Sequence, residues 1–139
     1  MDKYRKLGIN QHKMKYIKMR AEDIKFPDGY FDIVSSFNSF DHFDDLEKVI
    51  KEIKRTITSG GYFLLLTDIH ENPRVCEPQT FSWEIVREFE PELKLLHVQH
   101  YEKPVDGIYE SIKAGIPYDH TNKEKRDGVL SAKFIKLKG

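Results

Sequence analysis

A predicted strand, an amphipathic helix and a second strand follow one another in the first half of this chain, and this order constrains the fold more than any other feature. Phe31–Phe37 (FDIVSSF) has the pattern of a largely buried strand. Tyr62–Thr67 (YFLLLT) is apolar on both faces, as expected of a central strand in a parallel sheet. Between them, apolar residues recur three or four apart and predict one stripe on a helix of about four turns. They are Phe43, Leu46, Val49, Ile50, Ile53 and Ile57. This order predicts an α/β fold.

The residues around this helix predict where it begins and ends. Asp41 or Asp44 can cap its start, because an aspartate side chain accepts hydrogen bonds from the free N–H groups of the first turn. Ser59-Gly60-Gly61 predicts its end, because glycine readily adopts the left-handed conformation that terminates helices.

The remaining segments extend the α/β pattern, and we expect a single domain over residues 1–139. Lys15–Met19 is short and β-prone, a second helix is predicted at about Thr80–Phe89, and Leu93–Tyr101 and Val129–Leu137 are predicted strands. Between the last two strands, Pro104–Arg126 is polar and long, as is typical of a lid, a binding loop or a disordered segment.

Composition excludes several classes of partner. Lys and Arg number 23 and so do Asp and Glu, so no basic excess favours nucleic acid or an anionic membrane. The longest uncharged apolar stretch, around Tyr62–Leu66, is far shorter than the roughly 20 residues of a membrane span. The N-terminus lacks the apolar region of a signal peptide, and the single Cys76 fits a reducing compartment. We therefore expect a cytoplasmic protein.

Residues Ala21–Leu66 contain several short motifs in a fixed order. AEDI precedes FPDGYFD, SFNSFDH follows the first predicted strand, and KEIKRTITSGGYFLLL leads into the second. Together they resemble the middle of a class I, type-11-like methyltransferase that depends on S-adenosylmethionine. The resemblance implies a partial Rossmann-like sheet with flanking helices. Its strands would correspond to the family's strands 3 to 7, with the last strand antiparallel.

The resemblance also implies a site at the carboxyl ends of the strands, where sheets of this kind bind ligands. Glu22, Asp23 and Ile24 would lie near the adenine of the cofactor, and Phe37 and Asn38 near its methyl group. Asp41 and His42 would face a small-molecule methyl acceptor, since an aspartate can orient a histidine that acts as a base. Structural roles are the alternatives: Asp23 can cap the turn before Pro27, and His42 can belong to the start of the helix.

One motif of the family is absent. No Gly-x-Gly occurs in the chain, whereas family members hold the methionine part of the cofactor on a glycine-rich loop where a side chain would collide with the ligand. We therefore expect weak or absent S-adenosylmethionine binding by this chain alone. Two functions remain open: the C-terminal part of a methyltransferase, and a non-catalytic remnant that binds a partner or itself.

Metal binding and self-association can also be weighed from the sequence. His97 and His100 are three residues apart on a predicted strand and so point to opposite faces, which argues against a shared zinc ion. No metal site is predicted. The resemblance implies a sheet without the family's first two strands, so that one edge of Phe31–Phe37 has no partner. We expect either Lys15–Met19 to pair there or two chains to form a homodimer through this edge.

Overall fold

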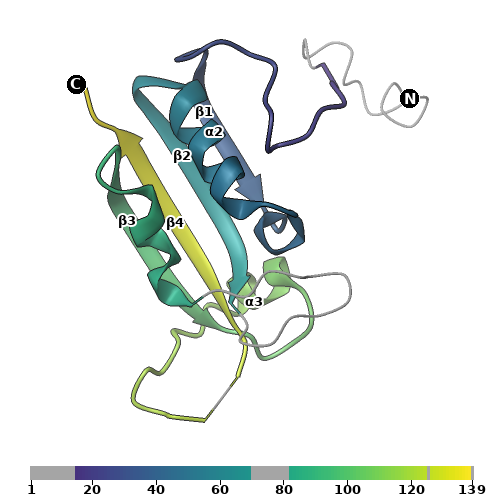
Figure 1. Cartoon of the computed structure of the whole chain (residues 1–139). Helices are drawn as coiled ribbons and strands as arrows, with labels where there is room; N and C mark the ends of the chain where they lie inside the picture. The colour runs from purple at the N-terminus through teal and green to yellow at the C-terminus, as the bar shows by residue number, and fades with distance from the viewer. Residues whose placement is uncertain (1–14, 70–81, 125, 139) are drawn as a thin grey trace.

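The computed structural model describes residues 15–69, 82–124 and 126–138, and these form a single sheet with helices on its faces (Figure 1). Four strands lie in the order β1 (Phe31–Phe37), β2 (Ile57–Ile69), β4 (Gly128–Lys136) and β3 (Leu93–Glu102). β1 is parallel to β2, whereas β4 is antiparallel to both β2 and β3. The α/β fold class and the antiparallel last strand are confirmed.

One face of the sheet carries most of the core. The helix α2 (Leu46–Thr56) and the 3-10 helix η3 (Trp83–Phe89) cover it, and their apolar side chains pack on those of the strands. Ile50 and Ile53 are buried in this core, as the helical stripe predicts. The helix α3 (Ile108–Ala114) covers one end of the opposite face, where Ile108 packs with Leu66 and Val129. No helix in the described part of the chain has the length and apolarity that crossing a membrane would require.

The ends of α2 differ from the prediction. Asp45, not Asp41 or Asp44, is the N-terminal cap, and its Oδ1 accepts a hydrogen bond from the Lys48 N–H at 3.2 Å. The helix ends at Thr56 and β2 begins at the next residue, so Gly60 and Gly61 lie within the strand. Gly61 is needed for close approach: a Cβ there would lie 2.7 Å from the Asp32 carbonyl oxygen of β1.

Three further segments correct the predicted elements. Lys15–Met19 forms no strand, and no strand of the described residues pairs with the outer edge of β1. The helix predicted from Thr80 is a 3-10 helix from Trp83, with residues 80 and 81 outside the described part. The long segment Pro104–Arg126 is partly helical, since it contains α3. β1 is less buried than its sequence predicts, with Ile33 58% and Phe37 48% exposed.

Candidate cofactor and acceptor site

A tight turn at the carboxyl end of β1 holds four of the predicted site residues. Asn38 takes a left-handed conformation with φ 59°, and its N–H donates to the Leu66 carbonyl of β2 at 2.7 Å. The Ser39 hydroxyl donates to the Phe37 carbonyl, and the short 3-10 helix η2 (Phe40–His42) follows. His42 is exposed and Phe37 half-exposed, so both can face a ligand, whereas the side chain of Asp41 lies outside the described residues.

The loop before β1 lies beside this turn. Arg20 Nη2 contacts Glu22 Oε2 at 2.6 Å and Asp44 Oδ2 at 3.1 Å, which brings the loop next to the start of α2. Asp23 is exposed and its carboxylate pairs with Lys25. The structure thus brings the two predicted halves of the site, one before and one after β1, to the same edge of the sheet.

A pair of charged residues on α2 holds the loop in place. Glu52 Oε2 accepts from the Ile24 N–H at 2.8 Å, and Arg55 Nη2 donates to the Ile24 carbonyl at 2.9 Å. Arg55 also binds the Phe26 carbonyl and the Asp28 carboxylate. The hydrogen bonds that Arg55 donates to the Glu52 carboxylate lower the pKa of Glu52 and raise the pKa of Arg55. The Glu52–Arg55 spacing is visible in the sequence, but its target more than 20 residues away is not.

The predicted cofactor residues differ in how accessible they are to a ligand. Asp23, Phe37 and Asn38 are exposed at the carboxyl edge and their side chains can reach a ligand. The side chain of Glu22 is only 11% exposed and is paired with Arg20, and both peptide groups of Ile24 are bound to α2. Of the predicted cofactor residues, Asp23, Phe37 and Asn38 are therefore the ones whose side chains are exposed.

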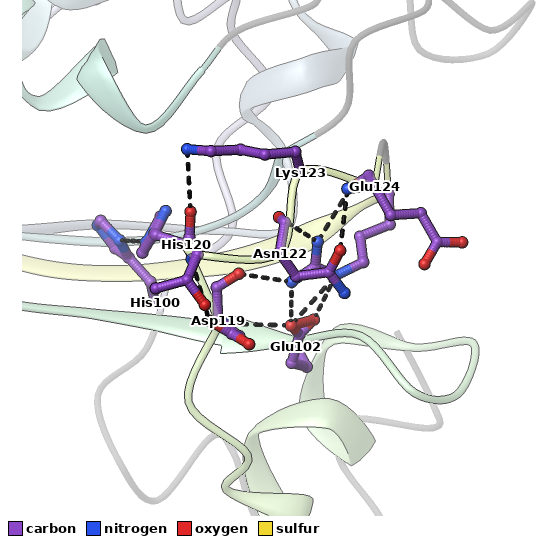
Figure 2. A network of polar contacts seen from close by, with 9 residues as sticks. His100, Glu102, Asp119, His120, Asn122, Lys123 and Glu124 are labelled. Carbon is purple, nitrogen blue, oxygen red and sulfur yellow. Dashed lines mark hydrogen bonds and ion pairs between the residues drawn. The ribbon is translucent and has the colours of Figure 1, made fainter.

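A second polar network lies at the end of β3, and Figure 2 shows it. Glu102 is its centre, paired with Arg126, and its carboxylate also accepts from the Asp119 N–H at 3.1 Å. The hydrogen bond from Arg126 lowers the pKa of Glu102. A cavity of about 360 Å³ lies beside this network, lined by Glu102, Lys103, Pro104, Ile116, Arg126 and Asp127.

Two histidines join the same network to the sheet. His100 Nδ1 and His120 Nε2 are 2.8 Å apart, and the Trp83 ring stacks on His100 with 4.1 Å between ring centroids. Burial lowers the pKa of His100, and the neighbouring His120 lowers it further. At the end of β2, Lys103 Nζ lies 2.9 Å from Asp68 Oδ1, with both side chains nearly buried. Sequence reasoning missed both pairs, because their members lie 20 residues or more apart and carry no local motif.

Comparison with known sequences identifies the type of domain. Residues 1–65 match the family model described as a methyltransferase domain. The tocopherol O-methyltransferase of Arabidopsis thaliana is 36% identical over 73 residues, which are 52% of this chain and 21% of that protein. The chain thus spans about a fifth of the length of this relative.

Comparison with solved structures supports the same fold. YcgJ of Bacillus subtilis has a TM-score of 0.70 at 18% identity, over 97% of this chain and 77% of that chain. The geranyl diphosphate C-methyltransferase of Streptomyces coelicolor, solved with S-adenosyl-L-homocysteine, has a TM-score of 0.67 at 14% identity. That match covers 98% of this chain and 59% of the other.

Proposed function

Because this chain belongs to the class I, Rossmann-like family of S-adenosylmethionine-dependent methyltransferases, we propose that it forms the C-terminal part of an enzyme that methylates a small molecule. The observation that carries the proposal is the match of residues 1–65, since this stretch contains both segments that meet at the carboxyl edge of β1. The sheet order and the antiparallel β4 support it independently.

The bound cofactor supplies a methyl group on a sulfonium, which is already a good leaving group. The protein therefore contributes mainly position and a dry environment. Phe37 offers an apolar surface beside the reacting centre, and Asn38 an amide at the end of β1. Asp23 would accept from a nucleoside amine.

The acceptor side requires a base only when the acceptor loses a proton in the reaction. In the proposed mechanism His42 takes that proton and Asp41 orients its ring. His42 lies in η2, exposed and one turn beyond Asn38, which is compatible with this role. A small-molecule acceptor is supported by the relatives, which include enzymes named for tocopherol and geranyl diphosphate.

The experiment that tests the proposal is an NMR titration of the 139-residue chain with S-adenosyl-L-homocysteine. We expect weak or absent binding, weaker than the low micromolar range, because the chain has no Gly-x-Gly. Any ligand-induced changes in chemical shift should be confined to residues 22–24 and 37–42, and Asp23→Ala should reduce these changes. Asp106, an exposed aspartate of the loop before α3, provides the control substitution Asp106→Ala. Chemical-shift changes confined to other residues would contradict this placement of the site, and a dissociation constant in the low micromolar range would contradict the expected weakness.

A second candidate is a non-catalytic module that binds a partner or itself. This candidate is supported by the backbone of Ile24. Its N–H and carbonyl are both hydrogen-bonded to side chains of α2 and are therefore not available to a ligand. A localised response in the same titration would favour the methyltransferase function over this one, because a module of this kind predicts none.

A further inference from the structure

The cavity beside Glu102 lies at the same edge of the sheet as the turn after β1. Because β2 and β3 are both antiparallel to β4, the strands β1, β2 and β3 run in one direction and their carboxyl ends share this edge. Sheets of this kind bind ligands there. The cavity volume of about 360 Å³ is close to the lower end of the range for small-molecule sites, roughly 300–1,000 Å³. It can therefore hold a small ligand or one end of a larger one.

Arg126 lines this cavity, and all five of its N–H groups are already used. Its Nε and Nη2 donate to the Glu102 carboxylate, Nη2 also donates to the Asp119 carbonyl, and Nη1 donates to two carbonyls of the loop in Figure 2. The Tyr118 ring covers one face of the guanidinium, with 4.1 Å between Cζ and the ring centroid. Arg126 therefore holds the loop on β3 and has no donor left for an anionic ligand.

The second cation at the cavity is also paired. Lys103 Nζ lies 2.9 Å from Asp68 Oδ1, and the two side chains are 12% and 8% exposed. Asp68 Oδ1 has no well-aligned hydrogen bond among the described residues, so the attraction of Lys103 compensates its burial. Glu102 is paired with Arg126, and Asp127 is not free either. The charges of the residues that line the cavity are thus all engaged.

The remaining lining of the cavity is apolar. Pro104 and Ile116 contribute to it, and the long side chains of Lys103 and Arg126 add methylene groups. A carboxylate or phosphate in this space would lose water without meeting a free cation among the lining residues, which costs far more than the transfer of a neutral group. The cavity therefore favours an uncharged, apolar ligand.

A series of contacts joins the cavity to the candidate site. The Asn38 N–H donates to the Leu66 carbonyl of β2. Asp68 follows two residues later on the same strand and pairs with Lys103, which lines the cavity. β1 and β3 are three strand spacings apart, or roughly 14 Å. The cavity is therefore too far from Asn38 to hold the group that reacts there, and it can hold only a remote part of the same molecule.

We propose that this cavity binds the uncharged, apolar end of an elongated methyl acceptor whose reacting group lies at the carboxyl end of β1. The role as an acceptor site rests on the proposed methyltransferase function, whereas the preference for a neutral apolar group does not. The Glu102–Arg126 and Lys103–Asp68 pairs determine this specificity, because each cancels a charge that would otherwise attract an ion.

An NMR titration of the 139-residue chain with 1-hexanol and with hexanoate tests the preference, because the two probes have equal chain length and differ in charge. Hexanol should shift the amide signals of residues 102, 103, 116, 126 and 127. Hexanoate should bind about tenfold more weakly, because its carboxylate would be buried without a partner. Ile116→Trp fills the cavity and should abolish the hexanol response. Leu96→Trp, at a similarly exposed residue in the other half of β3, should leave it unchanged.

One substitution should reverse the preference. Asp68→Asn removes the counter-charge of Lys103, so hexanoate should bind about tenfold more tightly to this variant than to the wild type. Asp68→Asn/Lys103→Met should lose that gain, and a circular dichroism melt shows whether each variant is folded. Equal wild-type affinities for the two probes, or a hexanol response that Ile116→Trp leaves intact, would overturn the proposal.

A longer neutral probe, 1-decanol, tests the connection to the methyl acceptor. It should shift residues 37–39 as well as the cavity residues, whereas hexanol should shift the cavity residues alone. Decanol that binds in the cavity without affecting residues 37–39 would overturn the assignment to an acceptor. That result would leave the proposed function standing, because the cofactor titration tests it separately.

Discussion

Replacing Glu52 by alanine should destabilise the fold by releasing the loop before β1 from α2. The Glu52 carboxylate accepts three hydrogen bonds: from Arg55 Nε at 2.9 Å, from Arg55 Nη2 at 2.8 Å and from the Ile24 N–H at 2.8 Å. Its side chain is 15% exposed, so water replaces these contacts incompletely.

The magnitude follows from the strength of such contacts. A hydrogen bond to a charged group contributes about 1.5–3 kcal/mol, and bonds to one shared carboxylate are not additive. We expect Glu52→Ala to lower the free energy of unfolding by about 2–4 kcal/mol, which corresponds to about 10 °C in Tm for a chain of this size. Glu88→Ala, at an exposed residue of η3, should change the free energy by less than about 0.5 kcal/mol.

The pH dependence separates a charge effect from a packing effect. The pKa of Glu52 is lowered in the folded state, so its contribution is complete above the ordinary value of 4.5 and is lost as the pH falls through the folded-state pKa. The difference in stability between the wild type and Glu52→Gln should therefore be constant above that value and should shrink below it. A Tm of Glu52→Ala within 2 °C of wild type, measured by calorimetry, would refute the reasoning.

Three other substitutions test separate parts of the structure. Ile53→Ala should cost about 2–5 kcal/mol in urea unfolding, because Ile53 is 4% exposed in the main core, and an unchanged midpoint would contradict the packing of α2 on β2. Gly61→Ala should lower the Tm, since its Cβ would lie 2.7 Å from the Asp32 carbonyl oxygen; a Tm equal to wild type would show that β1 and β2 are farther apart. The pKa of His100 is lowered, so folding loses stability as the pH falls below 6.5. His100→Gln should reduce the fall in Tm between pH 7.5 and pH 5.5, and an equal fall in both proteins would exclude this role.

Much of the fold could be predicted because its strands and α2 carry strong periodic patterns. β3 and β4 lie within one residue of their predicted ranges, β2 contains its predicted range, and α2 buries Val49, Ile50 and Ile53 of the predicted stripe. The end of α2 could not be predicted, since Gly60-Gly61 has the same local pattern whether it ends a helix or forms an irregular start to a strand. The strand predicted at Lys15–Met19 was wrong, because local strand propensity does not by itself decide whether a segment joins a sheet.

Of the candidate site, only the proximity of its two segments could be predicted. The turn after Phe37 lies at the carboxyl end of β1, and the Arg20–Asp44 ion pair brings the loop before β1 next to the start of α2. The contacts that position them were not predictable, since Glu52 and Arg55 act on backbone groups of Ile24 and Phe26 rather than on a residue type that sequence could single out. Ligand binding by Asp23, Asn38 and His42 stays a prediction.

The difference between the predicted and the observed burial of β1 has a physical meaning. Its sequence predicts a largely buried strand, yet no residue of β1 is fully buried and Ile33 is 58% exposed. Exposed apolar side chains on an unblocked edge strand cost solubility, and natural sheets suppress them with charges, bulges or cover. β3 in the same chain has such protection. Because β3 also exposes the apolar side chains of Leu96 and Val98, the two outer strands differ mainly in the backbone contacts that cover the end of β3.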